Sequence, residues 1–206
     1  MDVAYVDLPR EIPIDDLVDL FPMLTGKDGP LASTGRGKQG YLFPVSPRAA
    51  LALFKRVDHA ADVDRLLAAA SDATPGRVTT TNVSTVARIG QQTFRKRVVE
   101  RWDGKCAVTG ADIDSLLIAS HIIPWRIAND AERLDPANGL LLEARFDRLF
   151  DSGLISFDVD AQLLISSRLD IPNRLRLGLD PAMRLSRRYP NTDQYLRFHR
   201  ELIFLP

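Results

Sequence analysis

The chain has 206 residues, and its 27 lysines and arginines balance 27 aspartates and glutamates, so the formal net charge is zero. The 45% hydrophobic and 26% charged residues are typical of a globular protein and argue against disorder as the ground state. The single cysteine excludes a disulfide framework and a cysteine-built zinc cluster, and no apolar run is long enough to span a membrane. Because the first residues also lack the apolar core of a secretory signal, we expect a cytoplasmic protein with no membrane partner.

Residues 1–80 match no family that we can name. Prolines and glycines are dense in residues 1–46, which indicates short elements joined by loops. Residues 47–72 predict a helix that starts at Ser46 or Pro47, and the polar residues 71–85 predict a linker. We expect a small α/β region that serves DNA recognition or dimerisation. Its sequence GRGKQGYLF is compatible either with a DNA-reading loop or with a surface turn followed by a core strand.

The remainder of the chain, residues 85–206, predicts alternating helices and short strands. In the helix predicted for residues 85–102, Phe94, Val98 and Trp102 share one apolar stripe. The elements expected after it are a β-hairpin (105–123), a polar loop (125–138) and an apolar run (139–142). A short helix that Gly153 terminates (143–153), a second hairpin (154–167) and a final helix (191–204) follow.

Charge alternates along this second region. Residues 88–105 and residues 168–188 each carry six basic and two acidic side chains, whereas residues 143–160 carry five acidic side chains and two arginines. This alternation suits basic flanks that hold phosphates around an acidic, metal-binding centre. Solvated helix faces remain the alternative interpretation.

The three histidines differ in their surroundings. We expect His59 to lie at the surface and His199 to pack within the last helix or cap its surface. His121 lies inside the apolar sequence IASHII and is followed at once by Pro124 and Trp125. Such a histidine is either a buried hydrogen-bonded residue or a base held at the end of a strand.

A set of ordered motifs surrounds His121. Asn138 follows seventeen residues later, and Asp147 and Asp151 stand at positions i and i+4 of the next predicted helix, so both carboxylates can share one hard cation. The blocks CAVTG, SHIIPW, NGLLL and DRLFDSGLISF appear in this order within residues 106–157. Over residues 85–206 the sequence resembles the HNH endonucleases, in particular a bacterial branch with these blocks.

The resemblance implies an α+β fold with a ββα-metal core, surrounding helices and an additional β-hairpin. It also implies a metal-dependent DNA endonuclease that hydrolyses phosphodiester bonds. His121 would be the general base, and Asn138 a catalytic-site residue that braces the loop or helps to orient the histidine and the metal. Asp147 and Asp151 would bind the metal. Ser120 stands where many family members have a metal-binding Asp or His, so the sequence does not determine the full set of metal ligands. The basic side chains expected to contact DNA are Arg95, Lys96, Arg97, Arg145 and Arg148.

Oxygen ligands favour Mg²⁺ or Mn²⁺ as the cofactor. The expected role is restriction or anti-phage defence, with DNA as the partner and homodimerisation left open. The alternative is a DNA-binding or scaffold protein that keeps the fold with weak catalysis.

Overall fold

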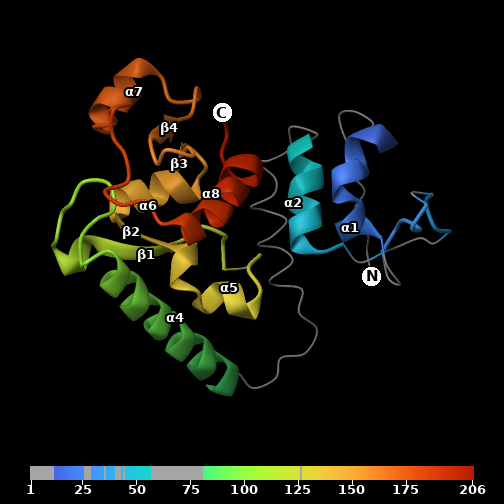
Figure 1. Ribbon diagram of the computed structural model, residues 1–206, viewed down its shortest axis with the longest axis horizontal. Coiled ribbons are helices and arrows are strands. Elements are labelled where there is room, and N and C mark those ends of the chain that lie inside the picture. The colour runs from blue at the N-terminus through green and yellow to red at the C-terminus, as the bar shows by residue number, and fades with distance from the viewer. Residues whose placement is uncertain are drawn as a thin grey trace. The chain divides into compact units, whose positions relative to one another are not determined.

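A computed structural model describes residues 12–25, 29–34, 36–39, 43, 45–56, 81–125 and 127–206. The contacts divide the chain into two compact units, residues 1–77 and residues 78–206. Helices combine with two small antiparallel sheets, which confirms the α+β class predicted from the sequence (Figure 1). Residues 57–80 lie outside the described ranges, and with them His59, most of the predicted linker and the second half of the helix expected over residues 47–72.

In the first unit, the described residues form the 3-10 helix η1 (Ile14–Leu20), the short helix α1 (Phe21–Leu24) and the helix α2 (Pro47–Arg56). Ser46 starts α2 as predicted, because its hydroxyl accepts a hydrogen bond from the backbone N–H of Ala49 at 3.2 Å. Leu24 of α1 and Leu51 of α2 are both buried. Within its described residues, this unit has isolated β-bridges and no regular strand.

The second unit begins with the long helix α4 (Thr81–Arg101). The predicted apolar stripe is its buried face, since Phe94, Val98 and Trp102 are all at most 3% exposed. The Trp102 indole donates a hydrogen bond to the carbonyl of Gly139 at 3.1 Å. Asp103 and Gly104 then take positive φ angles of 52° and 65°, which ends the helix.

The central sheet pairs β1 (Leu117–His121) antiparallel with β2 (Gly139–Glu143), and His121 lies opposite Gly139. The hairpin predicted over residues 105–123 is therefore wrong. The turn at Gly110 exists, with a φ of 75°, but the residues before it form no strand. Ala107 instead donates a backbone hydrogen bond to Leu141 of β2, and η2 (Asp114–Leu116) leads into β1. An apolar run in the sequence indicates a strand, but it does not indicate whether that strand pairs with the preceding segment or with a more distant one.

The connection between β1 and β2 is not a plain loop. It contains the helix α5 (Asp130–Leu134) and the 3-10 helix η3 (Pro136–Asn138). Asn129 and Glu132 form a reciprocal capping box at the start of α5. This Asn-x-x-Glu pattern is readable in the sequence, although our sequence analysis did not identify the helix.

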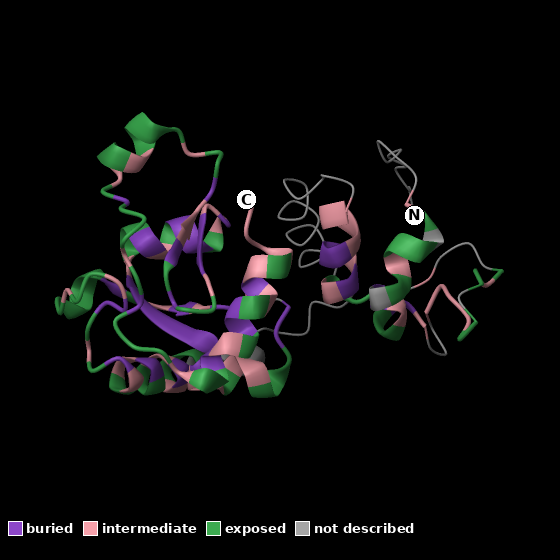
Figure 2. Cartoon of the chain, turned by 45° about the horizontal axis from the view of Figure 1, so that its top comes forward, coloured by how far each residue is buried: buried purple, intermediate pink, exposed green. Residues whose placement is uncertain are grey.

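Helix α6 (Ala144–Asp151) follows β2 directly. It ends at Gly153, as predicted: the backbone N–H of Gly153 bonds to Phe150 and that of Leu154 to Leu149, and Gly153 has a φ of 68°. Both α4 and α6 contact β1 and β2. Figure 2 shows buried residues concentrated along these strands.

The chain continues through β3 (Ile155–Phe157) and β4 (Leu163–Ile165), which pair antiparallel, to α7 (Ile171–Arg176) and α8 (Pro190–Leu202). In α8, His199 is 1% exposed and its ring stacks on Phe150 with centroids 3.7 Å apart. Its Nδ1 is 3.0 Å from the Ser156 hydroxyl, and its Nε2 is 3.1 Å from the Phe150 carbonyl. His199 is therefore a packing residue of the core.

Candidate active site

The end of β1 brings two different environments to consecutive residues. Successive side chains of a strand point to opposite faces of its sheet, so the side chains of Ser120 and His121 leave the end of β1 on opposite sides. His121 lies on the α4 side, opposite Gly139, where a Cβ would come within 2.8 Å of Phe94 and even closer to Val98. This close approach explains why glycine suits position 139. Ser120 lies on the other side, facing Asp147 of α6.

The imidazole of His121 is held between two aromatic rings. It stacks on Phe94 with centroids 3.6 Å apart and an interplanar angle of 11°, and it makes an edge contact with Trp125 at 5.4 Å. Its Nε2 lies 3.1 Å from the backbone carbonyl oxygen of Arg133. A carbonyl only accepts hydrogen bonds, so the proton of the neutral ring lies on Nε2 and the lone pair on Nδ1.

Burial of the ring lowers the pKa of His121 below its ordinary value of 6.5. The positive charge of Arg133 lowers this pKa further, whereas the hydrogen bond to the Arg133 carbonyl raises it. The net direction is downward, so the ring is neutral at neutral pH. A neutral histidine with a lone pair on Nδ1 is chemically a base.

Asn138 is fully buried, and its side-chain amide forms hydrogen bonds with backbone groups. Its Oδ1 accepts a hydrogen bond from the N–H of Ile123 at 2.8 Å, and its Nδ2 donates to the carbonyl of Glu132 at 3.0 Å. A longer contact of 3.4 Å joins Nδ2 to the carbonyl of Ile123. Asn138 thus ties the residues after His121 to α5, and its 0% exposure keeps it from touching a substrate.

Asp147 lies on α6 and is half-buried, and this burial raises the pKa of its carboxyl group above the ordinary value of 3.8. The Ser120 hydroxyl and the charge of Arg148 act in the opposite direction. Ser120 Oγ is itself buried and lies near this carboxylate without reaching the geometry of a regular hydrogen bond. A buried hydroxyl without a hydrogen-bond partner, beside a carboxylate whose charge burial destabilises, is a pair of oxygens that suits a divalent cation.

The expected second carboxylate, Asp151, is exposed at the end of α6. Over the described part of the chain, no group of three or more His, Cys, Asp and Glu side chains is arranged to hold a metal ion. The oxygens of Ser120 and Asp147 still fit Mg²⁺ or Mn²⁺, because Mg²⁺ typically takes one or two carboxylates and completes its shell with water and substrate phosphate.

The basic side chains singled out in the sequence divide into two groups. Arg95 pairs with Asp114 and donates to the carbonyl of Leu117, whereas Arg97 donates to the carbonyl of Leu134. Arg145 donates to the carbonyl of Leu177 and lies 3.7 Å from Glu143. By contrast, Lys96 and Arg148 are exposed and form no ion pair with the described residues.

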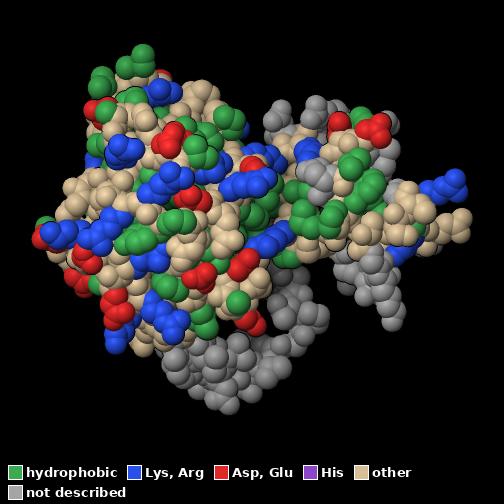
Figure 3. Space-filling view, in the orientation of Figure 1, with side chains coloured by type: hydrophobic (Ala, Val, Ile, Leu, Met, Phe, Trp, Pro, Cys, Tyr) green, Lys and Arg blue, Asp and Glu red, His purple; other side chains and the backbone are tan. Residues whose placement is uncertain are grey.

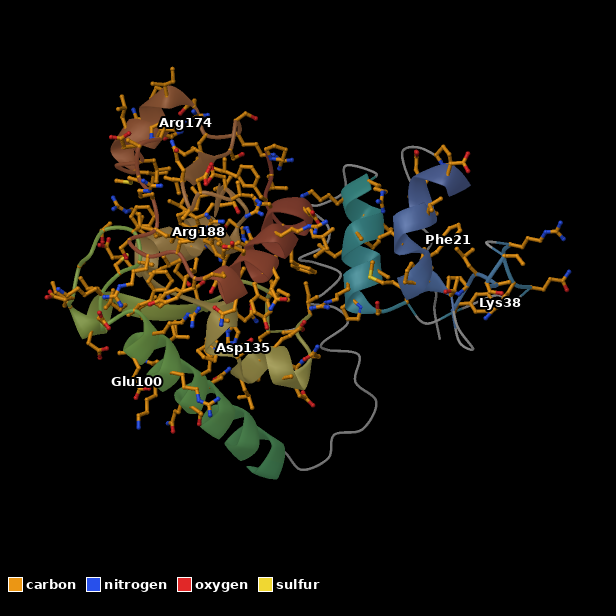
Figure 4. The ribbon with its side chains drawn as sticks, in the orientation of Figure 1. Phe21, Lys38, Glu100, Asp135, Arg174 and Arg188 are labelled. Atoms are coloured by element: carbon orange, nitrogen blue, oxygen red, sulfur yellow. The ribbon has the colours of Figure 1, made fainter. Side chains whose placement is uncertain are left out.

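Two contributors to this site were missed in the sequence analysis. One is the Arg133 carbonyl, which no side-chain motif can reveal because it is a backbone atom. The other is Asp135, whose carboxylate accepts a hydrogen bond from Tyr195 of α8 at 2.6 Å and another from the backbone of Ala137 at 2.8 Å (Figure 4). Asp135 therefore fixes η3, which carries Asn138, to the last helix.

The site thus combines a strand pair, a following helix, a partly buried histidine and two oxygen-bearing side chains between strand and helix, an arrangement compatible with phosphodiester cleavage. Comparison with known families gives the particular family: residues 106–158 match the family model described as HNH endonuclease. The match confirms the resemblance found in the sequence, over this segment of the chain. It indicates nuclease activity and hence a DNA substrate. A search of curated proteins found no match. No helix among the described residues is long and apolar enough to cross a membrane.

Proposed function

We propose that residues 85–206 form a ββα-metal nuclease domain that hydrolyses phosphodiester bonds in DNA with a divalent cation, Mg²⁺ or Mn²⁺. The observation that carries the proposal is the environment of His121, in which the Arg133 carbonyl holds the proton on Nε2 and leaves Nδ1 as the base. The family match over residues 106–158 supports the same assignment.

His121 Nδ1 accepts the proton of the attacking water in this proposal. The rings of Phe94 and Trp125 fix the plane of the imidazole, and Arg133 fixes its tautomer. A base positioned in this way contributes about 10²–10⁴-fold to the rate. Asn138 is a positioning residue, because it acts through the backbone of Ile123 rather than on the substrate.

Ser120 and Asp147 would hold the cation, and Asp151 would join them through a change of side-chain rotamer or through water. When bound, the cation would stabilise negative charge on the phosphate and on the leaving oxygen. Arg148, one residue after Asp147, and Lys96 of α4 are the cations with which we expect the domain to contact DNA phosphates.

Restriction or anti-phage defence is the biological role we propose, with residues 1–80 supplying recognition or homodimer contacts in the cytoplasm. The competing function is a DNA-binding scaffold with weak catalysis. His121 favours the enzyme because its Nδ1 has no hydrogen-bond partner among the described residues, whereas both ring nitrogens of the core residue His199 have one.

Incubation of the purified chain with modified and unmodified plasmids in Mg²⁺, Mn²⁺, Ni²⁺ or EDTA separates these functions. We expect cleavage with a divalent cation and none in EDTA. The His121→Gln variant is the sharp control, because a glutamine amide can still donate to the Arg133 carbonyl but cannot act as the base. Loss of cleavage with an unchanged melting temperature supports the role of His121. Cleavage within a few-fold of the wild type would refute it.

A further inference from the structure

Residues 166–184 form a projection from the second unit, here called the α7 projection. Both of its ends are anchored by backbone contacts. At the start, the N–H of Ser166 donates to the carbonyl of Leu154 at 2.9 Å; at the end, Leu163 donates to Met183 at 2.9 Å and Gln162 forms a β-bridge with Arg184. In Figure 1, α7 stands apart from the other helices of this unit. The projection is therefore a built feature of the fold and not a plain connecting loop.

Polar contacts hold the projection from within. Arg174, labelled in Figure 4, donates to the carbonyl oxygens of Leu169 at 2.6 Å and Ser166 at 3.1 Å. The carboxylate of Asp170 caps α7 by accepting a hydrogen bond from the N–H of Asn173 at 2.8 Å. The helix therefore forms without burying its own apolar side chains.

Two of those side chains, Ile171 and Leu175, are 70% and 73% exposed, and no other large hydrophobic residue of the described chain is more exposed. They stand at positions i and i+4, so they share one stripe of α7. Figure 2 shows the exposed character of this helix. Because the fold gains nothing from these positions, their apolar character points to a partner.

The surface around this stripe is positive. The projection carries four arginines and two aspartates. Both carboxylates accept hydrogen bonds from backbone N–H groups, Asp170 from Asn173 and Asp180 from Ala182. Arg168 is exposed and forms no ion pair within the described residues, and Arg176 is also exposed. Figure 3 shows hydrophobic and basic side chains side by side on this part of the surface.

The projection is attached to the helix of the candidate site. Arg145 of α6 donates to the carbonyl of Leu177 at 2.7 Å, at the end of α7. Asp147 lies two residues further along the same helix and, at this spacing, points to a different side of α6 from Arg145. The projection and the candidate site therefore share α6 as a support.

We propose that the α7 projection is a second DNA-binding surface, on which Arg168 and Arg176 contact phosphates and Ile171 and Leu175 pack into the minor groove. Apolar side chains flanked by basic ones are a common means of holding a minor groove. The inference rests on the proposed function, since it takes DNA as the substrate. The positive charge of the projection favours DNA over a second copy of the chain, whose formal net charge is zero.

The test measures binding of the full chain to a fluorescent duplex in EDTA over a range of salt concentrations. Ile171→Ser with Leu175→Ser should weaken binding by at least about tenfold, because burial of a single aliphatic side chain already contributes about that factor, and should leave the salt dependence unchanged. Arg168→Gln with Arg176→Gln should flatten the log–log salt slope by about 2, since each phosphate contact contributes about 0.9. Val159→Ser, at a residue that is 60% exposed in the β3–β4 turn, is the matched control and should change neither quantity.

Unchanged affinity and slope in both α7 variants, with wild-type DNA binding and cleavage intact, would overturn this inference alone. Absence of DNA binding and cleavage in the wild type would instead overturn the proposed function. A change from dimer to monomer on sedimentation of the Ile171→Ser, Leu175→Ser variant, with unaltered DNA affinity, would identify a second copy as the occupant and would also overturn the proposal.

Discussion

Replacement of Asn138 by alanine tests how the loop after His121 is held. The Asn138 side chain makes hydrogen bonds of 2.8 Å and 3.0 Å to the Ile123 N–H and the Glu132 carbonyl. Alanine leaves the buried N–H without an acceptor, which costs about 1–3 kcal/mol, and the lost bond to the carbonyl adds about 1 kcal/mol. We expect a total of about 3 kcal/mol, or a fall in melting temperature of about 10 °C for a unit of this size.

Calorimetry and denaturant titration would measure this loss, and plasmid cleavage would be assayed well below the new melting temperature. Cleavage should fall as well, because the backbone that follows His121 is no longer fixed. Asn173→Ala, on the exposed surface of α7, is the control and should change stability by no more than about 0.5 kcal/mol. An unchanged melting temperature with abolished cleavage would refute the reasoning, because Asn138 would then act on the substrate directly.

The remaining predictions concern the base, the metal, the phosphates and the strand contact. Cleavage should be lost as pH falls through the pKa of His121, at a value below 6.5, because only the neutral ring can accept a proton; a midpoint above 6.5 in the pH–rate profile would contradict the burial argument. The free energy of unfolding should also decrease as pH falls, since His121 has a lower pKa in the folded protein and the unfolded chain therefore binds the proton more readily. Asp147→Ala should abolish Mn²⁺ binding in a calorimetric titration, whereas Asp151→Ala distinguishes direct from peripheral coordination; unaltered affinity in Asp147→Ala sinks the proposed metal position. Lys96→Gln should reduce the salt slope of DNA binding by about 0.9 without altering sequence preference, and an equal slope would make Lys96 a solvated surface residue. Gly139→Ala should lower the melting temperature through about 1–3 kcal/mol of overpacking against α4, as thermal unfolding would show.

Local signals predicted those elements whose determinants are close in sequence. The stripe of Phe94, Val98 and Trp102 predicted the buried face of α4, and Gly153 predicted the end of α6, because both depend on spacing within one or two turns. The pairing of β1 could not be found in this way. Its partner, Gly139–Glu143, lies eighteen or more residues further on, and an apolar run carries no information about which strand it will meet.

The candidate site shows the same division. The motif order named His121 and Asp147, but only the fold shows that the histidine stacks on Phe94 and that Ser120 Oγ is buried beside the carboxylate. The number of basic side chains in the sequence also overestimates how many are available to contact DNA. Arg95 and Arg145 each hold a backbone carbonyl, a use of arginine that the sequence does not reveal.

The acceptor that orients His121 is a main-chain oxygen, and this has a consequence for how the protein tolerates change. Substitution of the Arg133 side chain alters the local charge but cannot delete the carbonyl, so the tautomer of the ring is insulated from point mutation at that position. Only a displaced backbone can remove the acceptor, for example after loss of the capping box at Asn129 that begins α5. A laboratory library that varies the exposed side chains of α5 should therefore keep the orientation of the His121 ring, while one that varies the length of the β1–β2 connection should not.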